Sequence, residues 1–126
     1  MKLRLVLASL LFVPALAHAD VSIDDNDQTV TVDCAKDKNV MISGNQATVT
    51  LTGVCERVVV AGNRATVTGS AAAVSVPGNE NTVTLAAVDL IATPGNLNTV
   101  TWKKPLTKAK AKVVNPGNKN KIKKVK

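Results

Sequence analysis

Apolar and polar residues alternate in short segments on either side of a recurring Gly-Asn dipeptide. In the earlier copies valine or isoleucine stands four and two positions before the glycine, as Val40 and Ile42 do before Gly44. In the last two copies only the residue four positions before the glycine is still apolar in this way. After the dipeptide comes Thr-Val-Thr, or a triplet related to it. A period of two is typical of strands that bury one face. Each unit therefore predicts a strand, a tight turn, a second strand and a looser turn.

This unit occurs six times along the chain. The glycine position is filled by Asp25, Gly44, Gly62, Gly78, Gly95 and Gly117, at steps of 19, 18, 16, 17 and 22 residues. One strand pair cannot bury its apolar face alone, whereas stacked units share a continuous apolar column. We therefore expect an all-β fold, a β-helix-like β-solenoid of about six coils of 16–22 residues.

An antiparallel β-hairpin meander is the open alternative, because each unit also fits two strands joined by a four-residue loop. The solenoid is favoured because the same residues recur at the same positions. Parallel stacking would place the turn asparagines in one ladder, amide on amide. The expected ladder consists of Asn26, Asn45, Asn63, Asn79, Asn96 and Asn118. In these turns we expect glycine to adopt a positive φ, and asparagine to tolerate left-handed geometry.

Residues 1–19 have the features of a secretory signal peptide. Lys2 and Arg4 precede an apolar stretch, and Ala17-His18-Ala19 forms a small-residue cleavage site. No later segment is long and apolar enough to span a bilayer. We expect a periplasmic or secreted protein in which residues 20–126 form a single β-repeat domain.

Cys34 and Cys55 are the two cysteines of the chain. In an exported protein such a pair most simply forms a disulfide. In the solenoid register the two cysteines lie in comparable turns of neighbouring coils. Their offsets from the glycine position differ by two residues, so some local slack is needed.

Charge is distributed unevenly along the chain, which has a formal net charge of +7. Residues 20–60 hold seven of the nine acidic residues, whereas the segment 103–126 holds ten lysines and no acid. A dense cationic end suits anionic envelope polymers or lipid headgroups. It also suits a solvated cap that blocks pairing at an open sheet edge. The candidate residues are Lys103, Lys104, Lys108, Lys110, Lys112, Lys119, Lys121, Lys123, Lys124 and Lys126.

The repeated x-V-x-V-x-G-N-x-N-T-V-T units, the early cysteine pair, the signal peptide and the late Trp102 resemble one known family. It is the exported bacterial family called domain of unknown function 3060. The likeness runs from about Val21 to Ile122, although the Lys-rich end departs from the typical pattern. The resemblance implies an all-β repeat fold and brings no assigned activity or catalytic residues.

The composition argues against enzymes. The only histidine, His18, is lost with the signal peptide, which removes serine and cysteine triads and most zinc sites. Trp102 alone remains as an aromatic residue and is expected to fill or cap the core. We therefore expect no catalytic residue, cofactor or metal. Without aromatic residues among the lysines, no specific nucleic-acid recognition is expected either.

The function that follows is a structural or adhesive role in the cell envelope, with the cationic end for anionic polymers. The alternative is a ligand-binding module that uses the Thr and Asn faces for a glycan or, less simply, for ice. The threonines would form two parallel files, although β-propensity alone explains threonine on a half-exposed strand. Self-association through the coil ends is a further option, and the lysines argue against it.

Overall fold

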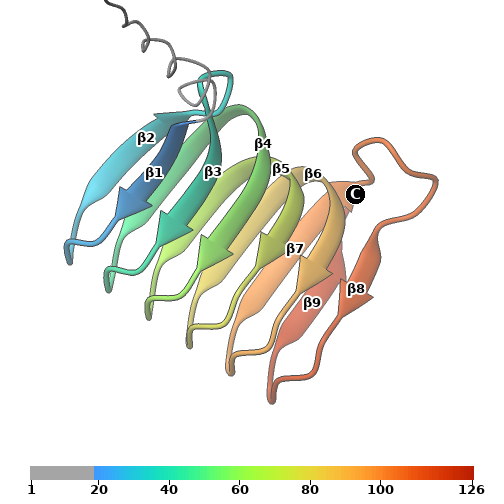
Figure 1. Cartoon of the computed structure of the whole chain (residues 1–126). Helices are drawn as coiled ribbons and strands as arrows, with labels where there is room; N and C mark the ends of the chain where they lie inside the picture. The colour runs from blue at the N-terminus through green and yellow to red at the C-terminus, as the bar shows by residue number, and fades with distance from the viewer. Residues whose placement is uncertain (1–18) are drawn as a thin grey trace, which may run out of the picture.

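The computed structural model describes residues 19–126, which form nine β-strands and no helix, wound into a stack of coils (Figure 1). The strands are β1 Ala19–Ile23, β2 Thr29–Asp33, β3 Asp37–Ile42, β4 Thr48–Val60, β5 Thr66–Ser75, β6 Thr82–Ala92, β7 Thr99–Lys104, β8 Lys112–Val114 and β9 Lys121–Lys124. The predicted signal peptide lies, apart from Ala19, outside the described residues.

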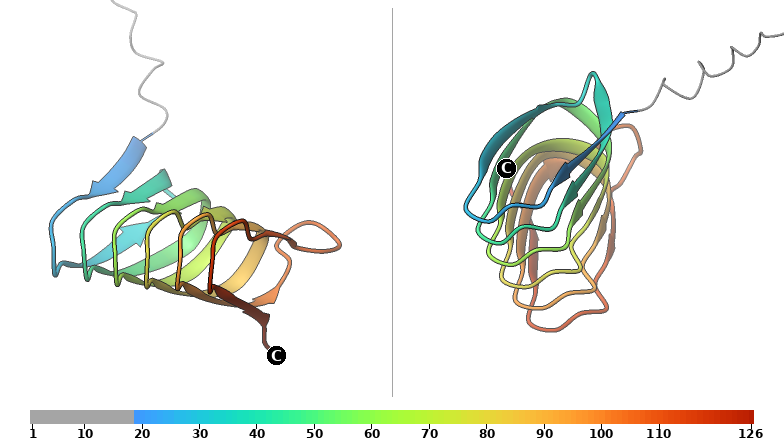
Figure 2. Two further views of the ribbon diagram at one scale, coloured as in Figure 1. Left: turned by 90° about the horizontal axis from the view of Figure 1, so that it is seen from below. Right: turned by 60° about the vertical axis from the view of Figure 1, so that its left-hand side comes forward.

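All strand pairs are parallel, and equivalent residues of successive units lie side by side. Thr48 pairs with Thr66, Thr66 with Thr82 and Thr82 with Thr99. The other pairings follow the same rule. The successive turns of the chain lie one behind another when the stack is viewed towards its end (Figure 2). The fold is therefore the predicted β-solenoid of about six coils, and the antiparallel meander is excluded.

Each coil has two faces joined at the Gly-Asn turn. The strands before the turns form one face, which we call the approach face: β1, β3, the later parts of β4, β5 and β6, and β8. The strands after the turns form the departure face: β2, the first parts of β4, β5 and β6, then β7 and β9. In the middle of the stack one long strand passes from a departure position to the next approach position.

The core is a narrow space between these two faces, filled by columns of aliphatic side chains. One column continues from Val49 through Val67, Val83 and Val100, all of them buried. On the opposite face Val40, Val58 and Val74 form a second column. The small size of β-branched residues suits this thin core, which explains why the chain needs so few aromatic rings.

Trp102 closes one of the columns near the C-terminal end. It pairs with Leu85, is half-buried, and packs against the aliphatic core, as expected from the sequence. Gly69 lies in the same column beside Leu85. A Cβ at Gly69 would overlap the Leu51 side chain, so Leu51 fills the space that Gly69 leaves.

The recurrent glycines are required by close packing between coils, and the expectation of a positive φ at these positions is wrong. A Cβ on Gly62 would overlap the backbone carbonyl oxygen of Gly44, one coil earlier. The same overlap arises at every recurrent glycine with the residue one coil before it. We call this set the glycine column, made up of Gly44, Gly62, Gly78, Gly95 and Gly117.

The left-handed residue of each turn comes two positions after the glycine. Its φ lies between 58° and 60° in all six coils. Glycine occupies none of these sites, which are filled by Asp27, Gln46, Arg64, Glu80, Leu97 and Lys119. Since left-handed φ disfavours most side chains, the hydrogen bonds of the stacked turns must hold these residues in place.

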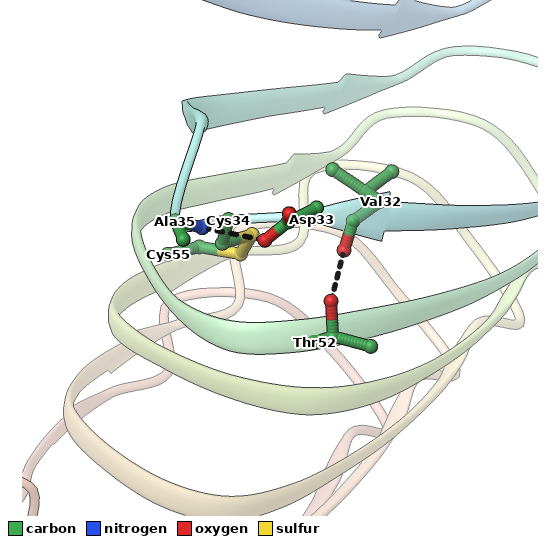
Figure 3. Close-up of a disulfide and its surroundings, with 6 residues drawn as sticks. All are labelled: Val32, Asp33, Cys34, Ala35, Thr52 and Cys55. Carbon is green, nitrogen blue, oxygen red and sulfur yellow. Dashed lines mark hydrogen bonds between the residues drawn. A yellow bond between two sulfur atoms is a disulfide. The ribbon is translucent and has the colours of Figure 1, made fainter.

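The disulfide expected from the sequence joins Cys34 and Cys55, whose Cα atoms are 4.8 Å apart (Figure 3). Both cysteines are fully buried. The two-residue difference in the offsets of the cysteines is taken up by a shift in strand register between Thr50 and Val54, around Gly53, which has a φ of 74°. The bond therefore fastens the first coils together across an irregular corner.

Substitution of Gly78 by alanine tests the glycine column. The new Cβ would meet the backbone oxygens of Ala61 and Gly62, which are held in strand-flanking turns. We expect a loss of about 3 kcal/mol in the free energy of unfolding, typical of severe overpacking. Urea unfolding is the measurement. The exposed control Thr82→Ala in the same coil should cost less than about 1 kcal/mol; equal losses would contradict the column.

Candidate functional site

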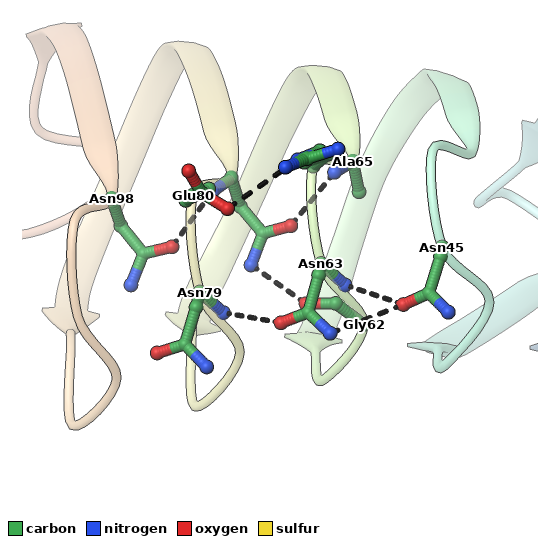
Figure 4. A network of polar contacts seen from close by, with 9 residues as sticks. Asn45, Gly62, Asn63, Ala65, Asn79, Glu80 and Asn98 are labelled. Carbon is green, nitrogen blue, oxygen red and sulfur yellow. Dashed lines mark hydrogen bonds and ion pairs between the residues drawn. The ribbon is translucent and has the colours of Figure 1, made fainter.

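The six turn asparagines lie in one exposed column, which we call the outer Asn ladder. Figure 4 shows its members Asn45, Asn63 and Asn79. In each step the backbone N–H of one asparagine donates to Oδ1 of the asparagine one coil earlier. Asn63 donates to Asn45 at 3.1 Å and Asn79 donates to Asn63 at 3.1 Å. The remaining steps, from Asn45 to Asn26, Asn96 to Asn79 and Asn118 to Asn96, measure 2.8, 3.0 and 2.9 Å.

This geometry differs in detail from stacked amides. Only between Asn63 and Asn45 does a side-chain Nδ2 also donate to the neighbouring Oδ1, at 3.2 Å. The side-chain oxygens of the first five asparagines, from Asn26 to Asn96, are engaged within the fold. The ladder therefore acts first as a connection between turns, and leaves mainly amide N–H groups for a ligand.

A second asparagine ladder lies inside the turns of the later coils and was not recognised in the sequence. Asn81 and Asn98 are buried, and Nδ2 of each donates to a glycine carbonyl of the preceding coil at 2.9 Å. Oδ1 of Asn98 accepts from the backbone N–H of Asn81 at 2.9 Å. Asn120 continues this inner ladder. The available signal was the second asparagine of Gly-Asn-x-Asn, present in the last three copies only.

The threonines form two regular files on the departure face, which we call the Thr face. Strand pairing places the members of each file side by side, about 4.8 Å apart as in any sheet. All are exposed except Thr99 and Thr101, which are half-buried. The files are Thr29, Thr48, Thr66, Thr82 and Thr99, and Thr31, Thr50, Thr68, Thr84 and Thr101.

The ten candidate lysines do not form a loose tail: Lys103 and Lys104 end β7, Lys108 and Lys110 lie in the loop that follows, and the other six belong to the sixth coil and the end of the chain. Lys121 and Lys123 continue the two threonine files on β9. Lys112 lies on the approach face, paired with Leu90, and Lys119 occupies the left-handed turn site. All ten side chains are exposed. We call these ten lysines at the C-terminal end of the stack the basic end.

Lys124 has a separate position within the basic end. It pairs with Trp102, and its Nζ lies 5.7 Å from the centre of the indole ring. A cation at this distance is attracted to the negative face of the ring. Trp102 is thus covered by a cationic side chain where the apolar column ends.

A loop between β7 and β8 carries Lys108 and Lys110 and is fastened by Asp89, a buried residue of β6. One carboxylate oxygen accepts the backbone N–H groups of Leu106 and Thr107 at 2.9 Å each, and that of Lys108 at 3.2 Å. The other accepts the Thr107 hydroxyl at 2.6 Å. The hydroxyl bond, with the three amides, lowers the pKa of Asp89 to about 2.

Asp89 was also missed in the sequence. Its signals are a single acidic residue within the apolar run Ala87-Val88-Asp89-Leu90-Ile91, and the 22-residue step that follows in the next repeat. Neither signal predicts that the Asp89 carboxylate faces the inserted loop, because the hydrogen bonds between them join residues 17 to 19 positions apart in the sequence.

Within residues 19–126 no three His, Cys, Asp or Glu side chains gather in a way that would hold a metal ion. The same residues contain no helix long and apolar enough to cross a membrane.

These features define a parallel β-solenoid protein with an asparagine-linked turn edge, a flat threonine array and a cationic last coil. The chain belongs to the family described as "Protein of unknown function (DUF3060)", which matches residues 42–73 and 62–119. No curated protein and no solved structure matches the chain.

The Asp89 contacts predict a pH dependence of the Lys-rich loop. Because the folded pKa lies below the ordinary value of 3.8, the ionised carboxylate stabilises the loop fully above that value. This contribution is lost as the pH falls through about 2. The Thr107 amide resonance should follow this titration in NMR spectra. Asp89→Ala should abolish the transition, whereas Asp33→Ala, which removes a carboxylate bound to a different turn, should leave it unchanged.

Proposed function

We propose that this chain is a non-catalytic, exported protein of the cell envelope whose basic end binds an anionic polymer or anionic lipid headgroups. The observation that supports this most directly is the state of the lysines. All ten are exposed, and the one ion pair within residues 19–126 joins Arg64 and Glu80 instead. The basic end is therefore an uncompensated cationic surface.

The fold fixes the relative positions of these charges. Lys121 and Lys123 lie on one strand, and Asp89 holds the loop with Lys108 through four hydrogen bonds. Charges held in place lose less side-chain and backbone freedom on binding than charges on a disordered segment. Such a surface suits a partner with many closely spaced phosphates or carboxylates.

A location outside the cytoplasm is part of this proposal. It is supported by the signal-like segment 1–19 and by the Cys34–Cys55 disulfide, because structural disulfides persist in oxidising compartments. The periplasm and the exterior of the cell fit these features equally well.

Deletion of residues 103–126 is not a clean test of the basic end. Residues 103–126 include β8, β9 and the side chain that covers Trp102, so their removal would uncover the core. Charge-neutral substitutions are the sharper probe. We choose Lys119→Gln, Lys121→Gln and Lys123→Gln together, since these exposed side chains lie on the turn and outer face of the last coil.

The matched control removes three cations elsewhere: Lys36→Gln, Lys38→Gln and Arg57→Gln. Binding to vesicles containing phosphatidylglycerol and to heparin would be measured across a sodium chloride series. At about 1 kcal/mol per lysine near an anionic surface, the basic-end variant should bind roughly a hundredfold more weakly at low salt. The control should bind nearly as the wild type does, and equal losses in both variants would contradict the proposal.

The Thr face supports a second candidate, a ligand-binding module for a regular surface such as a glycan. The supporting observation is the alignment of exposed threonine hydroxyls in two files across five coils. Retention of both lysine variants on an insoluble glycan, without dependence on salt, would favour the Thr face over the basic end.

A further inference from the structure

The two ends of the solenoid carry opposite charge. The first coil exposes Asp20, Asp24, Asp25, Asp27 and Asp33, and the sixth coil carries the basic end. Hydrogen bonds from the hydroxyls of Ser43 and Ser22 lower the pKa of Asp24, which favours its charged form. Two molecules placed head to tail would therefore attract one another.

Both ends also present open strand edges. β1 and β2 each pair on one side only, with β3 and β4, and β8 and β9 pair on one side only, with β6 and β7. A second copy stacked in the same parallel register would extend both faces of the solenoid. Unpaired edges of this kind are templates for association.

The glycine column decides whether such stacking occurs. At every interface within the molecule, the later coil contributes a glycine whose missing Cβ leaves room for a backbone carbonyl of the earlier coil. The first coil has Asp25 at this position. Within its own molecule Asp25 only supplies the carbonyl oxygen that faces Gly44, so its Cβ is harmless there.

In a head-to-tail stack the first coil would become the later coil of a new interface. The Cβ of Asp25 would then fall on the carbonyl oxygen of Gly117 in a second copy, as a Cβ on Gly117 would fall on that of Gly95. The overlap would separate the two turns. The hydrogen bond from the Asn26 amide to Oδ1 of Asn118 in the second copy, which would repeat the Asn45–Asn26 bond, would not form.

Steric exclusion outweighs charge attraction at this contact. Pairs of exposed charges contribute at most about 1 kcal/mol each and are screened by salt. A backbone overlap in the turn prevents the in-register ladder itself, on which stacking depends. We propose that Asp25 is an end stop, which prevents the first coil of one molecule from stacking on the basic end of another.

The end stop matters because head-to-tail stacking along the solenoid axis does not lead to a closed ring of copies. Each added copy would present a new basic end, so assembly would continue into a filament. A single Cβ at the first coil therefore separates a monomeric solenoid from an open polymer.

The test is the Asp25→Gly variant of the exported protein, with its N-terminus checked by mass spectrometry. Two controls accompany it. Asp25→Ala removes the same charge but keeps a Cβ, and Asp27→Gly introduces the same residue two positions away, outside the glycine column. Light scattering and electron microscopy across a concentration series would report assembly, and circular dichroism would report the fold.

We expect Asp25→Gly to show a mass that rises with concentration, roughly twofold or more above the monomer, with end-to-end particles. The wild type, Asp25→Ala and Asp27→Gly should remain monomeric. A folded but monomeric Asp25→Gly protein would overturn the proposal. It would also be overturned if the wild type assembled end to end, or if Asp25→Ala assembled as readily as Asp25→Gly.

Discussion

The close approach of one turn to the next at the glycine column is the constraint on which the rest of the structure depends. Neighbouring strands in a sheet lie about 4.8 Å apart, and the turns must keep the same spacing as the strands they connect. At the glycine column that spacing leaves no room for a Cβ. Once the turns are in contact, the outer and inner Asn ladders join them, and the valine columns are brought into register. The Thr face follows from the same register, because alternation sends the residues beside each buried valine outwards.

This constraint also shapes what the protein can do. The core between the two faces is filled by aliphatic side chains, so the surfaces available for binding are flat faces, a turn edge and two ends. The asparagine oxygens of the turn edge are engaged between coils from Asn26 to Asn96, which leaves the Thr face and the basic end as the main arrays of free polar groups. The chain changes its pattern at the basic end, where Lys121 and Lys123 replace threonine while the partly buried Ile122 still packs against the core. That substitution is compatible with the fold and alters only the outer surface.

The spacing of the repeat was sufficient to favour the solenoid over the meander and to predict its coil number, whereas the disulfide was predicted from the presence of two cysteines in an exported chain. The role of the glycines was not predictable in the same way. Their recurrence was visible, but a recurrent glycine fits both a positive φ and a close approach, and the structure shows the second. The left-handed site holds Gln46 in one coil and Leu97 in another, so no residue type marks it. The role of Asp89 was still harder to predict, because its carboxylate acquires its hydrogen-bond partners only when the inserted loop folds back against β6.

Amide hydrogen exchange of the turn asparagines tests the stacked-turn account most directly. Asn45, Asn63, Asn79 and Asn96 are exposed residues in turns, where backbone amides ordinarily exchange fast. Each of their amides donates to the asparagine of the preceding coil in this structure. The account predicts protection similar to that of the strand amides beside them, such as Val49 and Val67. Fast exchange at these four amides, with the strands protected, would show that the turns are not joined and would contradict the account.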